Sequence, residues 1–359
     1  MNAERLHTIA VSLKKEAKDR GIVTLLSAVV GLLEDPKLQK DSSLQRGLAN
    51  NLKALYSALS DTNSDAFSLE WRQVLRGMGG ERLYGAGLKQ RVEGVLAGNR
   101  PANAVGRELG QVLTDLKEFE SGLQDLILAF RLFHVKEEKL DPGECEIGLF
   151  IPRAAVRNRL LDFAGELKDL GFVLNTLSEV VTGQTDDLTI RAISSSELLV
   201  YLRAGAPYAA CVAVAIERVV ALYKQVLEIR RLHQEIQKQG VPREQTAGIE
   251  SYVNQLMETG IGRVSAEIVN EFYKGKDDAR KHELSNAVRI SLNRIANRID
   301  RGFVLQVRCE PIAKTHENPK DEEVQKAMSV VQAANANTKY PSLGGQPVLT
   351  LPEDTQRLT

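Results

Sequence analysis

Two short clusters of residues could together bind an anion. The first cluster is Arg153 and Arg157, one helical turn apart, and the second is the serine run 194–196. Arginines in the first turn of a helix oppose its dipole, so they are unfavourable there unless an anion or an acidic partner compensates them. The sequence therefore predicts a site for a phosphate or carboxylate group, formed by Arg153, Arg157, Ser194, Ser195 and Ser196.

This anion site depends on two predicted strands. Glu146–Ile151 and Leu188–Ile193 are short apolar runs bounded by turn residues, and each precedes a predicted helix. The second helix would begin with a capping box at Ser194–Glu197. Because βαβ crossovers make strands parallel, both helices would begin at one sheet edge, where open α/β sheets bind ligands. The alternative is that the arginines are solvated or pair with carboxylates such as Asp162, and that the serines only cap the helix.

A second basic group lies further along the chain. Arg294, Arg298 and Arg301 follow the spacing i, i+4 and i+7, which places them on one face of a predicted helix. Such a basic ridge could contact a nucleic-acid backbone through its phosphates. The alternatives are a solvated helix face and a docking face for an acidic partner.

Sequence patterns typical of catalysis or metal binding do not occur in this chain. The glycine-rich segment Gly77–Gly87 has the glycine spacing of a phosphate-binding loop, but Ala86 stands where its lysine must be. The sequence contains no HExxH and no GxSxG, and its five histidines are far apart. We therefore expect neither an enzyme nor a bound cofactor or metal.

A long apolar seam is the strongest pattern in the sequence. From Pro207 to Lys238, alternating steps of three and four residues place apolar side chains along one narrow stripe of a helix. The simplest interpretation is a long helical hairpin within this chain, and the alternative is a seam between molecules. The contact residues of the seam are Val212, Val219, Leu222, Val226, Ile229 and Ile236.

Composition and patterning predict a mainly α-helical protein. The 359 residues carry 47 basic and 47 acidic side chains, which argues against a global electrostatic grip on nucleic acid or lipid. We expect a helical bundle over residues 1–140. Residues 141–310 should form a small α/β unit with two or three short strands, the third at Phe303–Arg308, and with long antiparallel amphipathic helices. Residues 311–359 should form a polar, mostly flexible tail with one short helix at Asp321–Ala334.

The three cysteines and the apolar segments bear on location. Cys145, Cys211 and Cys309 are sparse and contain no CxxC, so we interpret them as structural residues in a reducing compartment. The apolar run Leu198–Ile216 is interrupted by charge, glycine and proline, which favours a buried helix over a membrane span. These features predict a cytoplasmic protein.

The resulting hypothesis is a non-enzymatic interaction or assembly protein. It would act through its long amphipathic helices as part of a homo- or hetero-oligomeric complex. The alternative is a regulatory or sensor protein that binds an anion, a nucleotide or a nucleic acid at the strand ends or on the arginine ridge.

Overall fold

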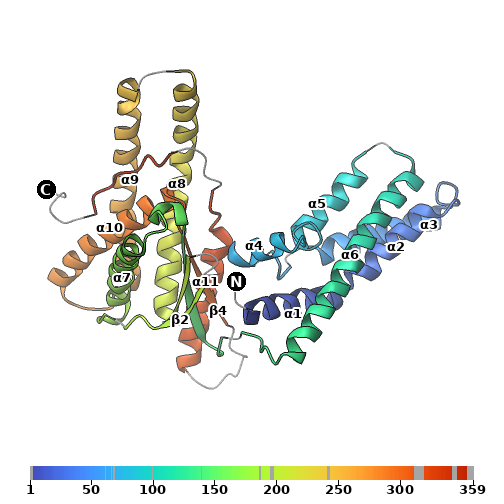
Figure 1. Ribbon diagram of the computed structural model, residues 1–359, viewed down its shortest axis with the longest axis horizontal. Coiled ribbons are helices and arrows are strands. Elements are labelled where there is room, and N and C mark those ends of the chain that lie inside the picture. The colour runs from blue at the N-terminus through green and yellow to red at the C-terminus, as the bar shows by residue number, and fades with distance from the viewer. Residues whose placement is uncertain are drawn as a thin grey trace. The chain divides into compact units, whose positions relative to one another are not determined.

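The chain folds into two compact units (Figure 1). The computed structural model describes residues 3–60, 62–65, 67, 69–98, 100–138, 140–185, 187–194, 198–240, 243–310, 319–341 and 346–353. The units are Met1–Lys139 and Leu140–Thr359, and each has its own hydrophobic core. Helices predominate, and the second unit contains a small antiparallel sheet, so the predicted mainly α class with a small α/β unit is confirmed.

The first unit consists of helices joined by turns and contains no strand among its described residues. Ile9, Leu13, Leu26, Leu88 and Leu109 are fully buried in its core, because each lies on the apolar stripe of an amphipathic helix. The long last helix packs against the first, second and fifth. The helices are α1 (Ala3–Asp19), α2 (Ile22–Glu34), α3 (Ser42–Ala58), α4 (Leu69–Gly77), α5 (Gly85–Leu96) and α6 (Ala102–Leu132).

The glycine-rich segment Gly77–Gly87 is the connection between α4 and α5, and it contains no strand. Gly87 lies so close to the backbone of Glu81 that a Cβ there would clash with the Glu81 carbonyl. The glycine is therefore required by close packing of this turn against the first turn of α5.

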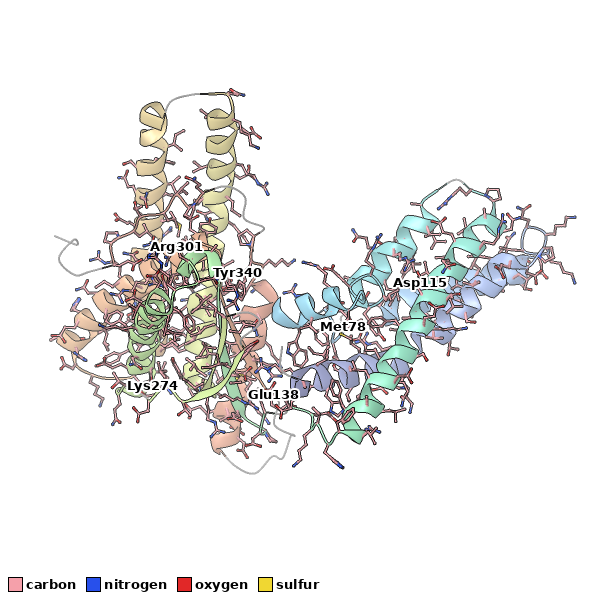
Figure 2. All side chains as sticks on the ribbon, in the orientation of Figure 1. Met78, Asp115, Glu138, Lys274, Arg301 and Tyr340 are labelled. Atoms are coloured by element: carbon pink, nitrogen blue, oxygen red, sulfur yellow. A yellow bond between two sulfur atoms is a disulfide. The ribbon has the colours of Figure 1, made fainter. Side chains whose placement is uncertain are left out.

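A buried ion pair fixes the end of the first unit onto its first helix. Arg5 Nε lies 2.5 Å from Glu138 Oε2, and His7 Nδ1 lies 2.8 Å from the carbonyl oxygen of Val135. Glu138 is labelled in Figure 2. The chain after α6 therefore returns to α1 before the second unit begins.

The second unit is built on a four-stranded sheet of order β2-β3-β1-β4. All neighbouring strands are antiparallel. Because β1 and β2 both pair antiparallel with β3, which lies between them, they run in the same direction without touching. The strands are β1 (Glu144–Ile151), β2 (Ile190–Ser194), β3 (Leu198–Gly205) and β4 (Val304–Cys309).

The two predicted strands are parallel members of one sheet, joined through α7, but β3 lies between them and the helix predicted directly after the second strand was wrong. A strand, β3, follows β2 where the sequence predicted a capped helix, and Ser194 is the last residue of β2. The apolar run that begins at Leu198 is short enough to be either a strand or part of a buried helix, and periodicity alone does not separate the two. Ser195 and Ser196 lie outside the described residues.

Long helices cover the sheet of the second unit (Figure 1). The side chains Cys145, Ile147, Leu149 and Ile151 of β1 belong to a core that also includes apolar residues of α7, α8 and α10. The helical elements are η1 (Arg153–Val156), α7 (Leu160–Thr182), α8 (Ala206–Lys238), α9 (Arg243–Phe272), α10 (Asp278–Asp300) and α11 (Pro319–Asn337).

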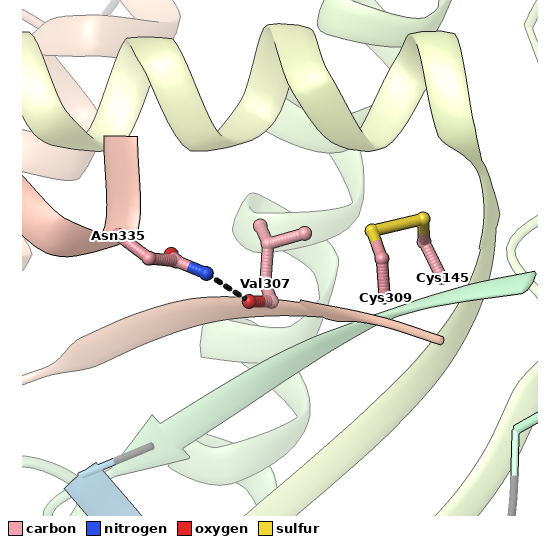
Figure 3. The surroundings of a disulfide bond; sticks show 4 residues. All are labelled: Cys145, Val307, Cys309 and Asn335. Atoms are coloured by element: carbon pink, nitrogen blue, oxygen red, sulfur yellow. Dashed lines mark hydrogen bonds between the residues drawn. A yellow bond between two sulfur atoms is a disulfide. The ribbon is translucent and has the colours of Figure 1, made fainter. Parts of the chain in front are cut away.

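A disulfide joins Cys145 of β1 to Cys309 of β4 (Figure 3). The two residues are directly opposite in the register, with Cα atoms 4.1 Å apart. The backbone of Leu305, four residues before Cys309, bonds outward, away from β1. By the alternation of an antiparallel ladder, Cys309 occupies a site without direct hydrogen bonds to its partner, where side chains come closest. The interpretation of the cysteines as structural residues did not anticipate this bond, and Cys211 is free and buried.

Side chains occupy the outer edge of β4. The Tyr340 hydroxyl accepts a hydrogen bond from Leu305 N at 3.0 Å and donates one to Leu305 O at 2.6 Å. Asn335 Nδ2 donates to the carbonyl oxygen of Val307 at 2.8 Å (Figure 3). Burial raises the pKa of Tyr340, so its hydroxyl keeps the proton that it donates.

The expected flexible tail is largely structured. Residues 319–337 form α11, and residues 346–353 cross the second unit as an extended segment. Leu349 and Leu351 are buried in the core. Helix α11 contains the short helix predicted at Asp321–Ala334, whereas residues 346–353 were expected to be flexible because an extended segment held by backbone hydrogen bonds and two buried leucines shows no helical periodicity.

Candidate interaction surface on the helical hairpin

Helices α8 and α9 form a long antiparallel hairpin, and its distal end extends beyond the rest of the second unit (Figure 1). Helix α8, whose apolar residues follow a heptad spacing, packs against α9. Gly240, at a φ of 82°, lies after the end of α8 in the left-handed conformation that glycine adopts readily. The predicted partner helix is thus in the same chain.

The proximal half of the seam is interior. Val212, Val219 and Val226 are fully buried. Leu222 packs against Gly260 of α9, where a Cβ would lie 2.8 Å from Leu222 Cδ2. These seam residues contribute to the core of the second unit and are not available to another molecule.

The distal half of the seam borders an apolar groove of about 370 Å³. Leu232 is 58% exposed and Tyr252 is 59% exposed, so two large side chains beside the groove face solvent. Ile229 and Ile236, both predicted seam residues, are partly buried here. The residues that line the groove are Ile229, Leu232, Ile236, Gly248, Ile249 and Tyr252.

The predicted anion site is not assembled as expected. Arg153 lies in the short helix η1 and donates to Asn158 Oδ1 at 3.2 Å. Arg157 has a φ of 48° and pairs with Asp162, with Nη2 and Oδ2 2.9 Å apart. Both arginines precede α7, so neither lies in its first turn. The pairing of an arginine with Asp162, considered above as the alternative, is the arrangement observed.

The arginine ridge faces carboxylates of its own chain. Arg298 has a side chain that is 2% exposed, and it bonds Glu166 Oε2 at 2.9 Å and Asp169 Oδ2 at 2.7 Å. Arg301 lies 2.8 Å from Glu166, and Arg294 lies 3.2 Å from Asp169. The three side chains thus join α10 to α7, an arrangement that leaves little of the ridge for the phosphates of a nucleic acid.

Polar residues of α9 and α10, which were not predicted as site residues, contact the extended segment 346–353. Asn293, Asn297 and Asp300 follow the spacing i, i+4 and i+7 beside an apolar stripe, and all three are buried. Polar residues at core positions are the signal that could have identified them. They bind the backbone of residues 346–353, together with Asn254.

Membrane and metal features are limited in the described residues. The window Ala206–Ile229 in α8 is long and apolar enough to cross a membrane, but 72% of it is buried inside the second unit, as in a core helix. No group of three or more histidine, cysteine or acidic residues could hold a metal ion in the described part of the chain.

Comparisons with protein-family models, with curated proteins and with solved structures found no match for this chain.

Proposed function

We propose that this chain is a non-enzymatic assembly protein that associates with a second copy of itself through the distal end of the α8–α9 hairpin. The observation that carries the proposal is the apolar groove beside two exposed side chains, Leu232 and Tyr252. Exposed apolar surface of this kind is characteristic of protein–protein contacts.

The geometry favours a second copy as the occupant. Each of the two helices uses one face on the other, and two such hairpins can bury their remaining apolar faces as a four-helix bundle. Under two-fold symmetry the same patch lies on both sides of the contact, so Leu232 and Tyr252 of one copy would fill the groove of the other. Ile229 and Ile236 would then regain the contact role predicted for them.

Light scattering coupled to gel filtration tests the proposal over a hundredfold range of concentration. The measured mass of the wild-type protein should rise from 39.6 kDa towards twice that value as the concentration increases. Leu232→Glu/Tyr252→Glu should weaken self-association at least tenfold, since it places two charges in an apolar contact. Both side chains are exposed, so the variant should keep the fold.

Leu161→Glu is the matched control. Leu161 is 84% exposed on α7, so the variant replaces an exposed apolar side chain by one charge away from the groove and should associate like the wild type. A wild-type chain that stays monomeric at every concentration would rule out the proposal, as would a Leu232→Glu/Tyr252→Glu variant that still doubles in mass.

The proposed anion- or nucleic-acid-binding role is less well supported, because Arg157, Arg294, Arg298 and Arg301 contact carboxylates of the same chain. A cytoplasmic location stays a prediction.

A further inference from the structure

We infer that the groove between α9 and α10 is a binding site for an extended peptide, and that residues 346–353 are its resident and exchangeable ligand. The ligand class is a peptide with apolar side chains at two alternate positions, followed by an acidic residue. Within this chain that pattern is supplied by Leu349, Leu351 and Glu353.

The groove recognises the peptide backbone. Asn297 Oδ1 accepts a hydrogen bond from Leu351 N, and its Nδ2 donates to Leu351 O, both at 3.0 Å. Asn254 makes the same kind of contact, accepting from Thr350 N at 2.8 Å and donating to Val348 O at 3.4 Å. Paired contacts to N–H and C=O groups are how proteins hold extended peptides of varied sequence.

Asp300 adds two further contacts to the backbone. Its Oδ2 accepts from Val348 N at 2.6 Å and from Leu349 N at 2.8 Å. A carboxylate that accepts two N–H groups forms charge-assisted hydrogen bonds, which are stronger than neutral ones. Together the three side chains satisfy the N–H groups of four successive residues, 348–351.

The side chains of the segment provide the specificity. Leu349 and Leu351 are buried in the core, whereas Thr350 between them is exposed, as expected for alternation along an extended chain. The carboxylate of Glu353 accepts from Asn297 Nδ2 at 2.8 Å and lies 3.4 Å from Arg298 Nη1. Side chains of α10 thus bind the acidic residue at the end of the peptide.

One hydrogen-bonding group of the groove is not used by the resident segment. Asn293 Nδ2 donates to Pro352 O at 2.8 Å. Its buried Oδ1 accepts no hydrogen bond from any described residue, and Pro352 has no N–H to offer. A ligand with another residue at this position could donate its backbone N–H to that oxygen. Such a ligand would make one more hydrogen bond to the groove than the resident segment does.

Binding of a peptide in trans tests the inference. The probe is a fluorescein-labelled peptide with the sequence of residues 346–354, and fluorescence anisotropy measures its dissociation constant with full-length proteins. Leu349→Asp/Leu351→Asp should release the resident segment and bind the probe at least tenfold more tightly than the wild type. Adding Asn297→Ala to this variant should weaken binding at least tenfold.

Thr350→Asp is the matched control, because it adds a charge to the same segment at an exposed position and should bind the probe like the wild type. A Pro352→Ala probe should bind more tightly than the native probe, and weaker binding would overturn the role assigned to Asn293. The inference fails if the folded Leu349→Asp/Leu351→Asp variant binds the probe no better than the wild type.

Hydrogen exchange in the wild-type chain gives an independent test that needs no variant. If the segment is exchangeable, the amides of Val348, Leu349 and Leu351 should exchange at least a hundredfold faster than those of Leu292 and Ile295 inside α10, since they open locally. Equal rates would show that the segment opens only when the unit unfolds, and would overturn the inference.

Discussion

The hydroxyl of Tyr223 on α8 donates a hydrogen bond to Asp300 Oδ1 at the end of α10, and both side chains are buried. The other carboxylate oxygen of Asp300 holds the extended segment through Val348 and Leu349. One carboxylate therefore connects the base of the hairpin, the last turn of α10 and the C-terminal part of the chain.

We expect Tyr223→Phe to lower the free energy of unfolding of the second unit by about 2 kcal/mol, because it removes a buried donor to a carboxylate. Urea unfolding followed by far-ultraviolet circular dichroism measures the change. Tyr252→Phe is the control, since that hydroxyl is on an exposed side chain, and it should alter stability by less than about 0.5 kcal/mol. Equal effects of the two substitutions would contradict the buried contact.

The Cys145–Cys309 disulfide should stabilise the second unit by about 5 kcal/mol, because it closes a loop of 164 residues in the unfolded chain. Reduction should lower the urea midpoint of the wild type. The Cys145→Ala/Cys309→Ala variant is the control, and its midpoint should not respond to the reductant.

Counting thiols checks the same bond directly. In denaturant without reductant, the wild-type chain should show one reactive thiol, that of Cys211, and three after reduction. Three thiols before reduction would mean that the bond does not form in the purified protein.

Gly87→Ala should destabilise the first unit by about 2 kcal/mol, because the added Cβ collides with the carbonyl of Glu81. Gly94→Ala in the same helix is a matched control, since nothing lies within 4 Å of its Cβ position. The control should be stabilising by about 0.5–1 kcal/mol, the usual gain of alanine over glycine inside a helix. The fluorescence of Trp71, the only tryptophan of the chain, reports on this unit. If both substitutions have the same sign, the close approach at Gly87 is wrong.

The first unit should lose stability as the pH rises above about 4.5. Burial raises the pKa of Glu16, although hydrogen bonds from Ser64 oppose the shift. Because the folded state then binds the proton more tightly than the unfolded chain, the stabilising contribution is complete below the usual pKa of 4.5 and is lost as the pH passes the raised pKa.

Glu16→Gln removes this titration, so the stability of the variant relative to the wild type should increase from pH 4.5 to pH 7. The urea midpoint of Trp71 fluorescence at several pH values measures it. Glu118→Gln, at an exposed position of α6, should follow the wild-type profile. A constant difference between wild type and Glu16→Gln across this range would refute the assignment to Glu16.

The sequence was sufficient where local periodicity determines structure. The helical patterning of residues 1–140 predicted helices such as α3, and the heptad spacing after Pro207 predicted the hairpin. It was insufficient for β3, because a short, mainly apolar run can be a strand or part of a buried helix, and the Gly205 and Pro207 that end it were interpreted as interruptions of one helix. It also missed the Cys145–Cys309 pair, since residues so far apart in sequence meet only in the folded sheet.

For the candidate sites, too, the sequence predicted positions along a helix but not the contacts between elements. The positions of Arg294, Arg298 and Arg301 on one helix face were predictable, but their partners on α7 were not, because charge spacing on one helix does not reveal the element packed against it. The exposed groove lies at Ile229 and Ile236, two of the predicted seam residues. The distinction between its exposed half and its buried half needed the packing of α9 and α11 against α8.

The contacts of Tyr340 and Asn335 along β4 limit how this sheet can grow. Their side chains already bond backbone groups of β4 that an incoming strand would need. This edge of the sheet therefore cannot act as a template for edge-to-edge association. Any strand recruited from another molecule would have to add at β2, the opposite border of the sheet.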